Sequence, residues 1–404
     1  MSQTQLKEVL APAYLEEFSC LGSECPDNCC HGWSIPVERE TYVQLRSLRD
    51  KALRPIIQKV LHRGTEKASD QNYAYLSTTV NSHAQCGLLS SDGWCKLQQK
   101  GGEQLLPDVC STFPRSTKFL YDRYEQFASP ACPEVARLLI EGSNPLRLRT
   151  SKKAVRLNQI ARPLPEIQAP AGRIIRKFYL SVFSTDDLPL WQVLAVHLLI
   201  AESVENVMQQ CEPDIAALQT ILANWTELLA NGQLLNELAQ LRRHEVLHLK
   251  VLAAASRLRA KIDVVSPRYL RLIDEALDAL CDNRSDAGDW TAENSFGNRN
   301  LGENIERSLR QVLLNRAWMD YYPNPMQLQA DVKRLCMEYL ILRFWVVGLT
   351  LARARLLDSN ELAELVYLFY RTSSHSPEYI ESCLTAFEQA GLRKVEHWLL
   401  LMPS

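Results

Sequence analysis

Apolar residues recur every three or four positions along most of the chain from Arg173 onward, the pattern of helices with one buried face. No segment there alternates between apolar and polar residues as a strand would. The pattern therefore predicts an all-α domain over residues 173–404. The clearest expected helices are Leu188–Gln210, Ile215–Leu229, Leu234–Lys261, Pro267–Leu280, Glu303–Asn315, Met326–Leu356, Asn360–Tyr370 and Pro377–Ala390.

The longest polar interruption of this pattern is Asp282–Gly302. Loops of this length are uncommon inside compact domains and are often functional. We expect this loop to help grip a protein substrate.

The first part of the chain has a different pattern, with many Gly and Pro turn signals and only short helical stretches, notably Pro36–Leu48 and Pro133–Glu141. Prolines then follow in RPLPEIQAPAGR. We predict a cysteine-rich domain over 1–145, a Pro-rich linker over 146–172 and the helical domain over 173–404. The expected fold class is mainly α.

Charge and hydropathy argue against two classes of protein, those that bind nucleic acids and those that span membranes. A net charge of -2 over 404 residues argues against a nucleic-acid-binding protein, which usually carries a basic excess. The apolar runs Leu190–Ala201 and Leu340–Ala352 are too short to span a bilayer and are predicted to be core helices. The first residues show no secretion signal, so we expect a cytoplasmic protein without a membrane partner. The oligomeric state is not predicted.

Cysteines give the chain its candidate chemistry. Eight of the twelve precede residue 133, and a reducing compartment favours metal binding over disulfides for such a set. Tight turns let neighbouring thiols converge on one metal. The predicted metal ligands are Cys20, Cys25, Cys29, Cys30, Cys86, Cys95, Cys110 and Cys132.

Iron–sulfur ligation suits these spacings better than zinc does, because paired C-x2-C knuckles are absent and Cys-Pro steps are present. One cluster with spare thiols, two clusters, or a cluster plus zinc all remain open. Adjacent Cys29 and Cys30 are not expected to bind one ion equivalently. Cys132 begins a predicted helix, where the helix dipole favours a thiolate. The isolated Cys211, Cys281, Cys336 and Cys383 are predicted to be buried small residues.

The segments CLGSECPDNCCHGW, CGLLSSDGWCKLQ, LPDVCSTFPR and ACPEVARLL, in this order, resemble a family of clustered-cysteine proteins assigned as zinc- or iron-chelating. Within that family the chain looks most like the bacterial flagellin lysine N-methylases. The resemblance implies an iron–sulfur methyltransferase of the bacterial flagellum system. It would move methyl groups from S-adenosylmethionine to flagellin lysines before export, with a 4Fe-4S cluster as the expected cofactor and flagellin as the partner.

Standard cofactor motifs do not supply the S-adenosylmethionine site. The chain has no G-x-G turn, and C-x3-C-x2-C is incomplete because Gly32 stands at its third position. Trp33 and Trp94, next to cysteine blocks, could stack on the cofactor or on a lysine cation, although packing around the metal is the simpler role. The catalytic residues remain unassigned.

Two alternatives belong to other classes. The chain could be a non-catalytic metal-binding scaffold whose helical part docks a partner. Alternatively, His244, Glu245 and His248 match the H-E-x-x-H zinc metalloprotease motif, with Glu275 or Asp278 as a conceivable third ligand. The flanking Arg242, Arg243 and Lys250 instead favour a solvated helix face.

Overall fold

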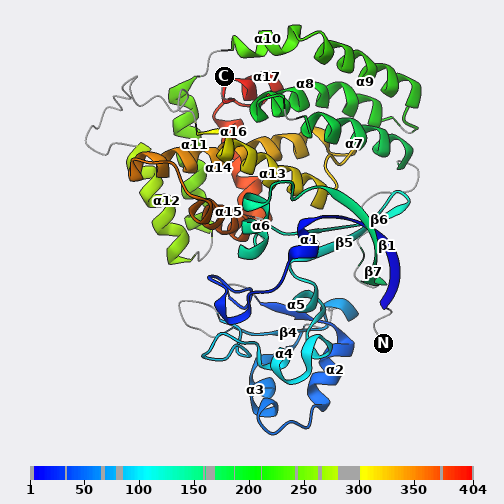
Figure 1. The fold of residues 1–404 in the computed structure, drawn as a ribbon, viewed down its shortest axis with the longest axis vertical. Coiled ribbons are helices and arrows are strands. Elements are labelled where there is room, and N and C mark those ends of the chain that lie inside the picture. The colour runs from blue at the N-terminus through cyan, green and yellow to red at the C-terminus, as the bar shows by residue number, and fades with distance from the viewer. Residues whose placement is uncertain are drawn as a thin grey trace.

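The structure is a computed structural model of residues 1–404. It describes the chain except for residues 1–3, 32–33, 65–68, 79–84, 158–159, 161–168, 186, 211, 242–243, 263–265, 281–300, 374–375 and 403–404. Helices dominate the described part, as the mainly α prediction requires, and two small sheets belong to the first 156 residues. Figure 1 shows a small lobe below, a helical domain above and a sheet between them.

The small lobe has its own hydrophobic core. Apolar side chains from residues 35 to 106 form it, and the partly buried Cys30, Cys95 and Cys110 pack against it. Its three-stranded antiparallel sheet has the order β2-β4-β3. The elements are β2 (Ile35–Val37), α2 (Arg39–Ser47), α3 (Leu53–Val60), β3 (Leu61–Arg63), β4 (Ala74–Leu76), α4 (Lys96–Gly101) and α5 (Asp108–Thr112).

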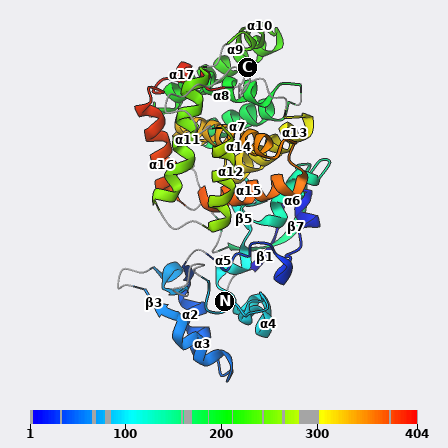
Figure 2. The ribbon, with the colours of Figure 1, turned by 90° about the vertical axis from the view of Figure 1, so that its left-hand side faces the viewer.

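A four-stranded sheet of order β5-β6-β1-β7 lies between the small lobe and the helical domain (Figures 1 and 2). Strand β1 pairs parallel with β6 and antiparallel with β7, and β5 and β6 form an antiparallel hairpin. The strands are β1 (Thr4–Pro12), β5 (Arg115–Leu120), β6 (Arg123–Ala128) and β7 (Leu148–Arg156). Strand β7 falls within the range expected to be linker. Its sequence LRTSKKAVR is mostly polar, and pairing along the whole of β1 makes it a strand.

The helical domain agrees closely with the predicted periodicity. No strand occurs among its described residues, and α14, buried along most of its length, runs through its centre against α8 and α12. The helices are α7 (Ala169–Phe183), α8 (Leu190–Met208), α9 (Ile215–Ala230), α10 (Gln233–Ala239), α11 (Glu245–Ile262), α12 (Pro267–Leu280), α13 (Glu303–Met319), α14 (Leu328–Arg353), α15 (Ser359–Ser373), α16 (Pro377–Gln389) and α17 (Val395–Leu399).

Two details differ from the sequence prediction. The helix expected over Leu234–Lys261 is two helices, because α10 ends at Ala239 and His244 starts α11 anew. Helix α14 is longer than its apolar run, and by length and composition it could cross a membrane. Its most apolar window is 83% buried within the protein, as a core helix would be.

The larger core crosses the expected domain boundary. Tyr14 of α1 (Tyr14–Glu17) and the apolar residues of α6 (Pro133–Glu141) belong to the same hydrophobic cluster as the helical domain. The Tyr14 hydroxyl donates to Asn315 Oδ1 of α13 at 2.7 Å and accepts from the backbone N–H of Ala128 at 2.9 Å. Cys132, at the start of α6, is therefore anchored to the helical domain, whereas Cys86 belongs to the small lobe.

Candidate functional site

Local pairing brings the cysteine blocks of the small lobe together. The Cys86 backbone N–H donates to the Cys30 carbonyl at 2.7 Å, and isolated bridges join Leu89 to Cys95 and Thr78 to Cys86. Cys95 directly precedes α4, and Cys110 lies within α5. Thiols far apart in sequence thus meet at the edge of one small core.

The thiols of this first group act on one another. The Cys30 thiol hydrogen-bonds Cys29 and lowers the pKa of Cys29 to about 7, while the same bond raises the pKa of Cys30. Burial raises the pKa of Cys110, and the charges of Cys29, Cys86 and Cys95 raise it further. These five cysteines form one electrostatic unit, in which the pKa shifts of Cys29 and Cys30 are opposite.

Cys20, Cys25 and Cys132 form a second group. Burial raises the pKa of Cys25, and Cys20 and Cys29 add to the rise. Cys132 is the N-cap of α6, so the predicted helix start is confirmed. Burial nevertheless raises the pKa of Cys132 to about 12, even though backbone N–H groups of Val135 and Glu134 lower it. Desolvation therefore outweighs the helix dipole at this thiol.

The donor set fits a thiophilic metal centre. Backbone N–H groups bond to the sulfurs of Cys25, Cys86, Cys95 and Cys132. Such N–H bonds orient thiolate ligands and tune iron–sulfur clusters, and a bound cation would offset the cost of burying thiolates. Within the described residues, no three His, Cys, Asp or Glu side chains lie close enough to hold one metal ion as they stand. Which sulfurs bind which ion stays a prediction.

The helical domain holds the segment between these thiols. Arg371 of α15 donates to the backbone carbonyls of Asp27 at 2.8 Å, Asn28 at 2.7 Å and His31 at 3.1 Å. It also pairs with the Asp27 carboxylate at 3.2 Å. Arg268 of α12 reaches the Pro26 carbonyl at 3.4 Å. Two arginines thus fix the segment Cys25–His31, which we call the cysteine loop.

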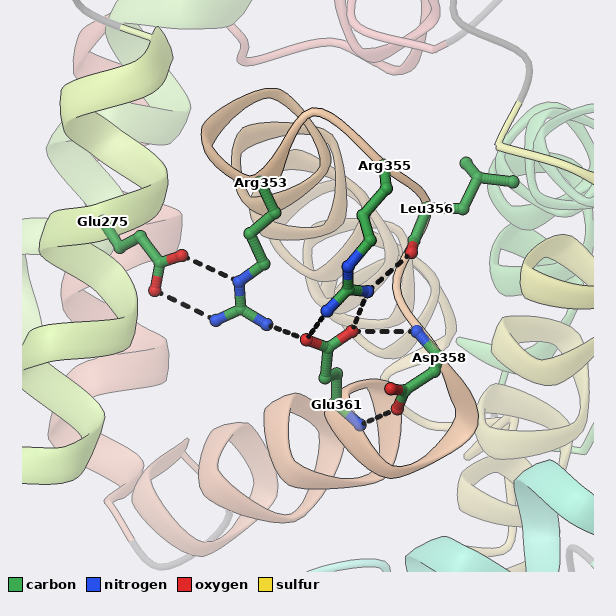
Figure 3. A network of polar contacts seen from close by, with 6 residues as sticks. All are labelled: Glu275, Arg353, Arg355, Leu356, Asp358 and Glu361. Carbon is green, nitrogen blue, oxygen red and sulfur yellow. Dashed lines mark hydrogen bonds and ion pairs between the residues drawn. The ribbon is translucent and has the colours of Figure 1, made fainter.

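A polar network fixes α15, the helix that carries Arg371 (Figure 3). Asp358 and Glu361 form reciprocal bonds, each side chain accepting from the backbone N–H of the other residue, at 3.0 and 2.9 Å. This capping box satisfies N–H groups at the start of the helix. The Glu361 carboxylate also forms ion pairs with Arg353 and Arg355. Arg353 in turn pairs with Glu275 of α12. Helices α12, α14 and α15 are therefore locked together beside the cysteine loop.

Of the two tryptophans predicted as possible stacking residues, the structure describes Trp94 and not Trp33. Trp33 lies outside the described residues, as does most of the predicted substrate loop 282–302. The ring of Trp94 packs on the backbone of Gly22, where an added Cβ would lie 2.5 Å from Cη2. Trp94 remains 38% exposed, so it covers the Cys20–Cys25 turn while one side of the ring faces solvent.

The H-E-x-x-H motif does not form a zinc site. His244 is exposed at the start of α11, where its Nδ1 accepts from the Leu247 backbone N–H at 3.3 Å, and Glu245 is also exposed. His248 is 1% exposed and faces the interior. The two imidazoles therefore lie in different environments, and within the described residues they belong to no group of side chains that could hold a metal ion. The solvated-face interpretation was right for His244 and Glu245 but wrong for His248.

Four residues around the cysteine loop escaped the sequence analysis: Arg268, Glu364, Tyr367 and Arg371. Glu364, Tyr367 and Arg371 are spaced three and four residues apart and so share one face of α15. Every amphipathic helix of the domain has that spacing. Only the contact with the cysteine loop distinguishes this face, and no signal in the sequence marks it.

Fold and site together define a two-lobed, mainly α protein in which clustered thiols lie against a helical domain. Comparison with known proteins shows which family within this class the chain belongs to. The model of the FliB lysine N-methylase C-terminal domain family matches residues 176–401. The lysine-N-methylases of Salmonella choleraesuis (strain SC-B67) and Salmonella typhimurium (strain LT2) are each 23% identical to the chain over 398 residues, covering 92% of this chain and 92% of each relative.

A third relative, the flagellar biosynthetic protein FliU of Salmonella muenchen, is 29% identical over 144 residues, covering 36% of this chain and 83% of that protein. No solved structure matches. The chain belongs to the FliB lysine N-methylase family. The resemblance carried by the cysteine blocks is thereby confirmed at the family level, and the protein is a lysine methyltransferase by family.

Proposed function

We propose that this protein transfers methyl groups from S-adenosylmethionine to lysine side chains of flagellin, with an iron–sulfur cluster held by its N-terminal cysteines. The observation behind this proposal is that thiols of all four cysteine blocks influence one another electrostatically, beside the helical domain that carries the family match. The flagellar name of one relative favours a flagellar substrate. Methylation before export places the reaction in the cytoplasm.

The reaction sets clear demands on the chain. A neutral lysine Nζ attacks the methyl carbon of the sulfonium, the carbon–sulfur bond breaks, and S-adenosylhomocysteine leaves with the bonding electron pair. The lysine must first release its ammonium proton, and the adjacent positive sulfonium and exclusion of water both lower its pKa. A protected space beside the helical domain meets this demand better than an exposed surface does.

The chain's own residues bring the thiols and the helical domain together. The cysteine loop is held against α12 and α15 by Arg268 and Arg371, so the thiols and the helical domain share one interface. A cluster bound there would supply Lewis-acidic iron. Backbone N–H groups at Cys25, Cys86, Cys95 and Cys132 would orient and stabilise the thiolates.

Anaerobic purification followed by iron, sulfide and zinc analysis tests the proposal. We expect broad absorbance at about 400 nm, about four irons per chain, and transfer of labelled methyl groups from S-adenosylmethionine to flagellin. The variant Cys95→Ser/Cys110→Ser should lose both iron and methylation. Cys383→Ala, which changes a buried thiol of α16 remote from the cysteine blocks, should keep both.

Each contrary result has a definite meaning. A colourless protein with stoichiometric zinc would overturn the cluster, and methylation by an iron-free variant would remove its role. Metal-loaded protein that binds no S-adenosylmethionine would leave a metal-binding scaffold instead of an enzyme.

A further inference from the structure

One face of α15 lies against the cysteine loop. Arg371 holds the carbonyls of Asp27, Asn28 and His31 at one end of this face. Glu364, two turns earlier, pairs with Arg268, which itself reaches the Pro26 carbonyl. Tyr367 stands between these two anchoring points on the same face, so its side chain lies under the loop.

Within the described residues, the Tyr367 hydroxyl is buried without a hydrogen-bond partner. The residue is 3% exposed, and buried tyrosine hydroxyls in folded proteins nearly always have a partner. Burial raises the pKa of Tyr367, Arg268 lowers it, and Glu364, Asp27 and Cys25 raise it, so all four lie within its electrostatic reach. The Arg268 guanidinium carbon lies 5.9 Å from the centroid of the Tyr367 ring. A buried donor is therefore available beside a predicted metal ligand.

The surrounding charges indicate what kind of ligand would bond to this hydroxyl. Arg268 and Arg371 balance Asp27 and Glu364, so the site carries both signs and almost no net charge. A zwitterion complements such a site better than a single cation or anion does, because each of its charges finds an opposite one. The Arg268 side chain is 41% exposed, so a ligand can reach its guanidinium from solvent.

We propose that Tyr367 and Arg268 bind the amino-acid end of S-adenosylmethionine beside Cys25, with the Tyr367 hydroxyl donating to the ligand carboxylate. This inference rests on the proposed function, since it assigns a place to that cofactor. Asp27 and Glu364 face the ligand ammonium, and the sulfonium lies toward the thiols. Tyr367 then has the hydrogen-bond acceptor that the described part of the chain does not provide.

Binding of two nucleosides to the anaerobically purified protein tests this assignment. S-adenosylhomocysteine carries the amino-acid end, whereas 5′-methylthioadenosine lacks it. In Tyr367→Phe we expect the dissociation constant for S-adenosylhomocysteine, measured by calorimetry, to rise about tenfold, because one hydrogen bond to a charged group is lost. The dissociation constant for 5′-methylthioadenosine should stay unchanged.

A matched control is available in the turn between β5 and β6. Tyr121 also has a buried hydroxyl without a partner among the described residues, but it lies next to Gly172 and Arg173. Tyr121→Phe should bind both nucleosides as the wild type does. Neither substitution should lower the ligand-free unfolding temperature or the iron content, because each removes an unsatisfied polar group.

The outcomes separate this inference from the proposed function. Wild-type protein that binds neither nucleoside would overturn the proposed function and this inference with it. Unchanged S-adenosylhomocysteine binding by Tyr367→Phe would overturn the inference alone. An equal loss for both nucleosides, or a lower ligand-free unfolding temperature, would show that Tyr367 supports the fold instead of binding the amino-acid end.

Discussion

Lys118 of β5 is an unusual residue because its ammonium is buried among charges. It lies 4.5 Å from the centroid of the Tyr321 ring and faces Asp320, Arg176, Arg316 and Glu125. Burial lowers the pKa of Lys118 to about 8, against a reference value of 10.5. Below pH 8 the folded protein therefore bears the cost of a poorly solvated ammonium. As the pH rises from 8 to 10.5, the folded state loses this proton before the unfolded chain does, and stability rises.

This difference in pKa predicts the behaviour of Lys118→Met. At pH 7 the variant should be more stable than the wild type by about 2–3 kcal/mol, less the loss of the Tyr321 contact. The advantage should shrink toward zero as the pH approaches about 10.5. Urea unfolding of both proteins at pH 7 and 9.5 measures this difference in stability. The exposed Lys59→Met on α3 is the control and should show no such trend, and a pH-independent advantage would contradict the assigned pKa.

At the level of elements, the packing of α12 on α14 depends on a glycine. A Cβ added at Gly348 would lie 2.5 Å from the Ala276 carbonyl oxygen and 2.9 Å from both the Ala276 Cβ and the Leu280 Cδ1. Replacing glycine by alanine usually stabilises a helix by about 1 kcal/mol. Here the two helices would have to move apart, because backbone cannot yield as a flexible side chain can.

We therefore expect Gly348→Ala to destabilise the protein by about 1–3 kcal/mol, the opposite of the intrinsic preference. Chemical unfolding gives the value directly. Ala223→Gly, at an exposed position of α9, measures the intrinsic preference of a helix for alanine over glycine. It should lower the free energy of unfolding by about 1 kcal/mol. A Gly348→Ala protein more stable than the wild type would rule out the close approach of α12 and α14.

Across the whole molecule, one buried ion pair joins the four-stranded sheet to the helical domain. Arg176 of α7 contacts Glu125 of β6 at 2.8 Å, and the side chains are 3% and 2% exposed. Arg176 also donates to the backbone carbonyls of Trp318 and Tyr322, and its guanidinium carbon lies 4.8 Å from the Trp318 ring centroid. The sheet, α7 and the end of α13 therefore meet at one charged group.

Removing Glu125 leaves the Arg176 charge buried without its carboxylate partner. Glu125→Gln should lower the free energy of unfolding by about 3–5 kcal/mol, and the double variant Glu125→Gln/Arg176→Met should recover part of that loss. A double-mutant cycle measured by urea unfolding gives the coupling. Strictly additive effects would mean that the pair does not join the sheet to the helices energetically.

How much of the fold could be predicted differs between its helices and its strands. Helix α12 has the predicted bounds Pro267–Leu280, and α6 the predicted bounds Pro133–Glu141, because periodicity and a proline at the first helical position are local signals. Strand β7 could not be recognised, because its mostly polar residues give no alternating pattern. Its partner β1 makes it a strand.

The sequence alone determined the helical domain, the family and the set of thiols, since side-chain periodicity and cysteine spacing are properties of neighbouring residues. Only the tertiary structure decided that the thiols form two groups linked by Cys29, and that α15 holds the cysteine loop. The bond from Arg371 to the His31 carbonyl joins residues 340 positions apart. Such a contact depends on how whole elements pack, and a local pattern carries no information about which distant backbone a side chain will reach.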